Sequence, residues 1–147
     1  MSYRCVIGIL ASALLLPAPE RSMIVYSADA IVIGELTRRV WKESSDRIGV
    51  SGVIPVQRVL YGKVSSGSRL TYQFTCLKEQ CGKVESVKLL FNSHVAGIGI
   101  WFLKRNSNAS WASAGDVFDD GFRPHTEEDL SYTQHAVNRR VEQERLK

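Results

Sequence analysis

The sequence predicts an all-β fold that curls into a small barrel and ends in one C-terminal helix. From Met23 onward, short apolar stretches are separated by polar or glycine-containing breaks, a rhythm typical of short strands. In the segment Gly52–Val64, Ile54 and Val56 share one face, but the apolar residues resume at Val59, one position out of phase. Such a slip indicates a β-bulge, which bends a strand as a barrel requires. The charged tail after residue 123 instead has the pattern of a helix.

Residues 1–22 carry the three regions of a secretory signal peptide. Met1–Arg4 is short and basic, Cys5–Leu16 is an apolar run of about a dozen residues, and Pro17–Ser22 breaks it. The run is shorter than the roughly 18 apolar residues that a membrane span needs. The alternative is a buried N-terminal helix or strand. We expect cleavage near residues 19–23 and a mature protein that is periplasmic or secreted, without a membrane span.

Composition limits the remaining possibilities. The chain of 147 residues is 44% hydrophobic and 23% charged, which suits one globular domain. Counted from Met23, it holds 17 basic and 14 acidic residues, a net charge of +3. This balance is too mild to indicate a nucleic-acid surface, which needs clustered cations. We therefore expect a barrel domain over residues 23–123 and a helix or tail over 124–147.

The first strands follow from alternation and glycines. We expect a first strand over Ile31–Leu36 that bends at Gly34, because a glycine inside a strand marks a bend or a close approach. A polar turn over Lys42–Arg47 leads into the long bulged strand, which Gly62 closes because glycine tolerates positive φ. Leu70–Phe74 alternates apolar and polar residues and is the clearest half-buried strand.

Two cysteines remain once the leader is removed. Cys76 and Cys81 are an even pair in an oxidising compartment, so we expect a disulfide; zinc is disfavoured because it needs about four ligands. The segment between them reads as a hairpin connection, which would place the cysteines at the base of neighbouring strands. The next strand is expected over Val84–Phe91, with Val87, Leu89 and Phe91 on one face. A helix there is the less favoured interpretation, because β-branched residues and the short length disfavour it.

The last strand and the tail complete the fold. Ile100–Leu103 is apolar on both faces, as expected of a strand with the barrel core on one side and a covering segment on the other. In the tail, Thr126 can cap a helix, with acidic residues in its first turn and basic ones near its end. We expect this helix to dock loosely on the barrel or to fray, its narrow apolar stripe formed by Leu130, Val137 and Val141; a partner-binding helix is the alternative.

Candidate sites are few. The histidines His94, His125 and His135 each read as surface or loop residues, and no catalytic set follows from their spacing. The acidic cluster of Asp116, Asp119 and Asp120 fits no calcium loop and reads as a solvated turn. We therefore expect no catalytic residue, metal or cofactor. A candidate binding face consists of Tyr72, Trp101, Trp111, Arg58 and Arg69. For its aromatic residues, packing in the core or at the rim of the barrel is the favoured interpretation.

Three stretches of the sequence resemble a known family. Ser27–Leu36, Val56–Gly62 and Gly99–Leu103 are similar to recurrent signatures of bacterial exported domains with the fold of tissue inhibitors of metalloproteinases. The resemblance covers about residues 27–122. It implies a five-stranded OB-type Greek-key barrel of the netrin-like class, with a helix packed beside it. The inhibitor function does not carry over, because that function depends on a Cys-x-Cys start and Met23–Ala30 contains no cysteine.

Function is therefore expected to lie in binding. The favoured hypothesis is a non-enzymatic exported module that binds an envelope or extracellular protein. The first alternative is an OB-type binder of single-stranded nucleic acid, which requires cations clustered with Tyr72 and Trp101 on one face. The second alternative is a small extracytoplasmic hydrolase, which requires His94 to meet a nucleophile and a carboxylate.

Overall fold

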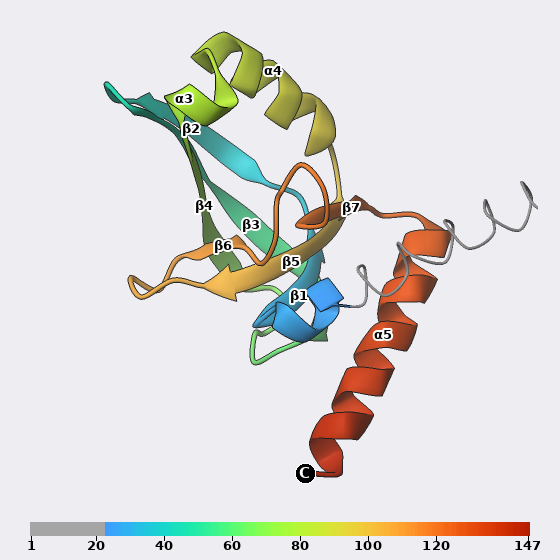
Figure 1. Ribbon diagram of the computed structural model, residues 1–147. Helices are drawn as coiled ribbons and strands as arrows, with labels where there is room; N and C mark the ends of the chain where they lie inside the picture. The colour runs from blue at the N-terminus through green and yellow to red at the C-terminus, as the bar shows by residue number, and fades with distance from the viewer. Residues whose placement is uncertain (1–22) are drawn as a thin grey trace, which may run out of the picture.

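A computed structural model describes residues 23–147, so the predicted signal peptide lies outside the described residues. The described chain forms one seven-stranded sheet with helices at its ends (Figure 1). A short helical turn at residues 23–27 comes first. The strands are β1 (Ala30–Gly34), β2 (Thr37–Glu43), β3 (Arg47–Tyr61), β4 (Arg69–Leu77), β5 (Gly99–Arg105), β6 (Trp111–Ser113) and β7 (Phe122–Pro124). The helices are α3 (Lys78–Cys81), α4 (Val84–His94) and α5 (Glu127–Arg145).

Five of the strands close into a barrel. The order runs β1, β3, β4, β6 and β5, and β5 pairs back onto β1. All these pairings are antiparallel except the parallel contact of β4 with β6, where Tyr72 faces Trp111. Strands β2 and β7 lie outside the closed ring and pair with β3 and β5. The predicted five-stranded OB-type barrel with a C-terminal helix is confirmed.

The long strand β3 bends where its alternation slips. Along β1, Ile31 pairs with Tyr61, Val32 with Val59 and Gly34 with Val56, so β3 gains an extra residue twice along this pairing. Alternate residues of β3 are buried up to Val56, and the next two are exposed. The expected bulge is confirmed. On one edge β3 pairs with β2 along its first half and, beyond the bend, with β1 along its second half.

Two apolar layers share strands β1 and β5. The barrel interior is filled by side chains such as Val32, Ile54 and Trp101. On the opposite face of the same strands, Ile31 and Ile100 belong to a second cluster that α5 and the helical turn at 23–27 cover. The expectation that β5 is buried on both faces is therefore confirmed.

Helix α4 corrects one prediction. We expected a strand at Val84–Phe91, but these residues begin an eleven-residue helix. Val87 and Phe91 are buried and lie one helical turn apart. Leu89, which a strand would place on the same face, is 74% exposed. The ring of Phe91 packs between Trp41 and Phe74 at the end of the barrel, with ring centroids 5.5 Å apart in both pairs. Tertiary packing thus outweighs the β propensity of the valines.

The first strand is also shorter than expected. The segment predicted as one bent strand over Ile31–Leu36 stops at Gly34, and the chain resumes as a separate strand, β2, at Thr37. A Cβ at Gly34 would lie 2.7 Å from the carbonyl oxygen of Pro55. The glycine therefore permits the close approach of β1 to β3, as expected of a strand glycine, and the chain then turns away from the barrel wall.

Helix α5 docks on the barrel. The Thr126 hydroxyl accepts a hydrogen bond from the backbone amide of Asp129 at 3.1 Å, which confirms the predicted cap. Ala136 and Val137 are buried in the second apolar cluster, whereas Val141, expected in the stripe, is half exposed. The docked face is therefore narrower than the predicted stripe and ends one turn earlier.

Arg140 and its neighbours fix the far end of α5. Its Nη1 donates to the carbonyl oxygens of Val25 at 2.5 Å and Ala28 at 2.7 Å, and its guanidinium lies 4.0 Å from the ring centroid of Tyr61. The Tyr61 hydroxyl donates to Glu144, and this bond holds the pKa of Glu144 below its ordinary value of 4.5. This stabilisation is therefore present above pH 4.5 and is lost as the pH falls through the folded-state pKa.

We expect Arg140→Ala to lower the free energy of unfolding by about 1.5 to 3 kcal/mol, because it removes charged hydrogen bonds to two backbone carbonyls. Urea unfolding followed by circular dichroism measures the change. Arg145→Ala is the matched control on the same helix, since its side chain is 72% exposed and its ion pair, to Glu142, lies on the surface; we expect less than about 0.5 kcal/mol. Equal effects of the two substitutions would contradict the docking of α5 through Arg140.

Candidate functional site

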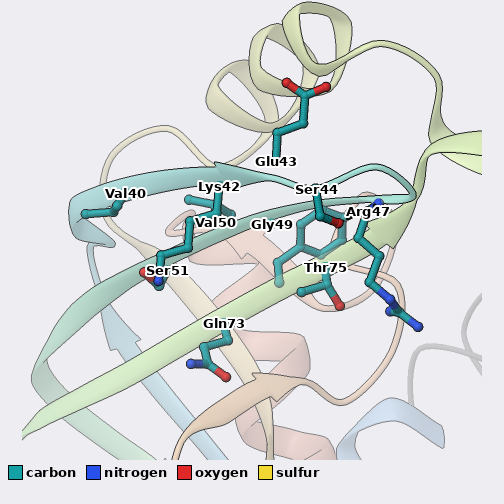
Figure 2. A pocket seen from close by; sticks show the side chains of 11 residues that line it. Val40, Lys42, Glu43, Ser44, Arg47, Gly49, Val50, Ser51, Gln73 and Thr75 are labelled. Carbon is teal, nitrogen blue, oxygen red and sulfur yellow. Dashed lines mark hydrogen bonds between the residues drawn. The ribbon is translucent and has the colours of Figure 1, made fainter.

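An open trough crosses the outer face of β2, β3 and β4 (Figure 2). Gly49 and Ser51 of β3 form its floor, because strand alternation turns them away from the core and their side chains are small. Residues paired with them on each side are longer and form its walls. On β2 these are Val40 and Lys42, and on β4 they are Gln73 and Thr75. The trough has a volume of about 420 Å³. We call it the outer-face trough.

The outer-face trough has an excess of positive charge because, in the described part of the chain, its acidic residue is paired and its two basic residues are not. Lys42 and Arg47 line it, and within residues 23–147 neither side chain has an ion pair. The one acidic residue in the lining, Glu43, points away from the other side chains in Figure 2, and its carboxylate lies 2.5 Å from Nζ of Lys78. The trough therefore presents two uncompensated cations beside Val40, which is 52% exposed.

Two of the aromatic residues proposed for a binding face belong to the core. Tyr72 and Trp101 have no exposed surface, and their ring centroids lie 5.0 Å apart inside the barrel. The Tyr72 hydroxyl is 2.8 Å from that of Ser113, and the Trp101 indole donates to the Gly34 carbonyl at 3.0 Å. Burial raises the pKa of Tyr72. These rings cannot stack on a ligand, so the face required by the nucleic-acid alternative is not formed.

The other three residues of the candidate face separate. Arg58 is exposed on β3 and lies beside α5, where it lines a groove with Leu130 and His135. Arg69 and Trp111 line one hollow on another part of the barrel, with Trp111 only 6% exposed. The structure therefore unites Arg69 with Trp111 but separates both from Arg58.

The predicted disulfide between Cys76 and Cys81 is present, with Cα atoms 6.3 Å apart. It does not clamp a hairpin, because Cys81 belongs to α3 rather than to a neighbouring strand. The bond instead fastens the helical turn to the end of β4. Chain entropy predicts a stabilisation of about 2 kcal/mol for so short a loop.

The His94 ring and the Asp116 carboxylate have structural surroundings in the described residues. His94 packs its ring near Phe118 and Phe122, and its Nε2 is buried without a hydrogen-bond partner, so it does not meet the requirement of the hydrolase alternative. Asp116 organises a turn, since its carboxylate accepts from the amide of Phe118 at 2.9 Å. Over the same range no three His, Cys, Asp or Glu side chains gather where a metal ion could be held.

The outer-face trough was missed from the sequence. Its signal is the run Gly49–Gly52, where small residues occupy the outward positions of a strand that is otherwise large and apolar. Alternation shows which residues face outward, but it does not show that β2 folds back beside β3 and supplies one wall. That pairing follows a bulge between Thr37 and Val40, at which Arg38 has a φ of 54°.

Comparison of the chain with protein-family models, with curated proteins and with solved structures finds no significant match. In residues 23–147 no helix is both long enough and apolar enough to cross a membrane.

Proposed function

We propose that the protein is an exported, non-enzymatic binding module that holds a segment of a partner protein in the outer-face trough. The observation that carries this proposal is the trough itself, an uncovered hollow of about 420 Å³ on the outer face of a closed barrel. Small side chains at its floor leave room between the two walls, which run along β2 and β4. In OB barrels the corresponding face commonly carries the ligand.

The chemistry of the lining favours an acidic, extended segment. Lys42 and Arg47 attract carboxylates, since Glu43 is already paired with Lys78. Val40 offers an apolar contact, while Gln73 and Thr75 offer hydrogen-bonding groups on the opposite wall. An extended peptide with acidic residues and one apolar side chain meets all three requirements.

A charge reversal tests this assignment. The full-length chain, tagged and expressed in its own host, is used to recover partners from the cell envelope. We expect Lys42→Glu with Arg47→Glu to lower recovery of the partner about tenfold or more, because attraction becomes repulsion. Arg58→Glu is the matched control and should retain recovery, since Arg58 lies beside α5. Equal recovery by the double variant and the wild type would overturn the proposal.

Export is part of the same proposal. It is supported by the signal-peptide pattern of residues 1–22, by the resemblance to exported netrin-like domains, and by the disulfide, which persists in an oxidising compartment. A fusion of residues 1–30 to a reporter should leave the cytoplasm and be processed near residues 19–23. An uncleaved reporter retained in the cytosol would contradict export.

A further inference from the structure

A second hollow, separate from the outer-face trough, lies where the β3–β4 loop meets the end of β5. It has a volume of about 310 Å³ and shares no lining residue with the trough. Three cations, Lys63, Arg69 and Arg105, line it together with hydroxyl groups. We call it the basic hollow. Its lining is Lys63, Val64, Ser65, Ser68, Arg69, Leu70, Thr71, Arg105, Ala109 and Trp111.

The positive charge of the basic hollow is not neutralised. Its lining contains no aspartate or glutamate. Within residues 23–147 none of its three cations lies within ion-pair distance of a carboxylate, although Arg140, Arg123 and Lys78 elsewhere do. Asp29 lies nearby, but its carboxylate accepts from the backbone amide of Arg105, at 2.9 Å. Like charges that share a hollow repel one another, and an anion between them relieves that repulsion.

Arg105 is held in a defined position. It pairs with Trp111 across β5 and β6, and its guanidinium carbon lies 5.6 Å from the indole. Contact with the ring orders the guanidinium while leaving donor groups available. The Trp111 side chain is 6% exposed, so it supports the arginine and offers no free face for a stacked base.

We propose that the basic hollow binds a phosphate group of a small phosphate ester. Arg69 and Arg105 supply planar sets of donors that match two oxygens of one phosphate, and Lys63 adds a third charge. The exposed Ser65 and Thr71 can donate hydrogen bonds to the remaining oxygen or to the ester. Without an exposed aromatic ring in the lining, the hollow recognises the phosphate and not a nucleic-acid base.

Calorimetric titration of the full-length protein with glycerol phosphate, at fixed ionic strength, tests this proposal. We expect binding by the wild type and a loss of affinity of about tenfold or more in Arg69→Gln with Arg105→Gln, because both planar donor sets disappear. Arg58→Gln, an exposed arginine outside the hollow, is the matched control and should bind like the wild type. No binding by the wild type to glycerol phosphate or to vesicles that contain phosphatidic acid, or equal losses in both variants, would overturn the proposal.

Two further experiments identify the source of the phosphate. The first measures how much protein sediments with phosphatidylcholine vesicles that contain phosphatidic acid, compared with vesicles of phosphatidylcholine alone. If only these vesicles bind, and binding requires Arg69 and Arg105, the phosphate is recognised as a lipid headgroup. Binding of glycerol phosphate instead identifies a soluble ester. A single-stranded oligonucleotide that binds far more tightly than either, through the same arginines, would replace this proposal with nucleic-acid binding.

Discussion

Replacing Trp101 with alanine is expected to lower the free energy of unfolding by about 3 to 5 kcal/mol. Its side chain is fully buried and lies 4.8 Å from Phe122 and 5.0 Å from Tyr72, measured between ring centroids. Truncation leaves a large cavity in the barrel and removes the hydrogen bond to the Gly34 carbonyl. Strand β1 pairs with both β3 and β5, so the cavity lies where the barrel closes.

Urea unfolding measures this loss of free energy. A second variant, Trp101→Phe, leaves a smaller cavity than Trp101→Ala. The phenylalanine variant keeps a six-membered ring but loses the five-membered part of the indole together with its N–H donor, so we expect a smaller loss, of about 1 to 3 kcal/mol. It also remains measurable if Trp101→Ala fails to fold. Leu89→Ala is the exposed control on α4, with less than about 0.5 kcal/mol expected. A loss below about 1 kcal/mol for Trp101→Ala would mean that the barrel interior is not built around this ring.

Gly62→Ala is expected to destabilise the protein by about 2 to 5 kcal/mol. Gly62 has a φ of 104°, which strains any residue with a side chain, and a Cβ there would lie 2.6 Å from the carbonyl oxygen of Asp29. The two nearest contacted atoms belong to the backbone of Asp29 and Ala30, so they cannot move aside as a flexible side chain would. The substitution therefore separates the end of β3 from the beginning of β1.

Gly67→Ala is the matched control for the steric part of this effect. Gly67 also has a positive φ, of 85°, but a Cβ there would meet nothing within 4 Å. We expect about 1 to 2 kcal/mol from backbone strain alone. The difference between the two variants, measured by urea unfolding, reports the clash with β1. If the two losses are equal, β3 does not approach the beginning of β1 as described.

Much of the barrel could be predicted because local rules and tertiary structure agree there. The phase slip after Val56 marks a real bulge, Gly62 has the positive φ that its position requires, and Thr126 caps its helix. Each of these signals depends on a few neighbouring residues. They could therefore be recognised before any long-range contact was known.

Helix α4 and the candidate site could not be predicted in the same way. Val84–Phe91 is compatible with periods of 2 and 3.6, and the choice is made by the rings of Trp41 and Phe74, which are distant in sequence. Core packing was the favoured interpretation for Tyr72 and Trp101 and is confirmed, so these residues offer no binding face. The outer-face trough depends on the return of β2 beside β3, a pairing that no local pattern specifies.

The most direct test of the binding proposal is photo-crosslinking from the floor of the outer-face trough. A photoreactive amino acid is placed at Ser51 in the full-length chain, and at Gln57 as an exposed control beyond the trough on the same strand. We predict one protein adduct from Ser51, none from Gln57, and loss of the adduct when Lys42→Glu and Arg47→Glu are added. Adducts from both positions, or an adduct that survives the charge reversal, would contradict binding in the outer-face trough.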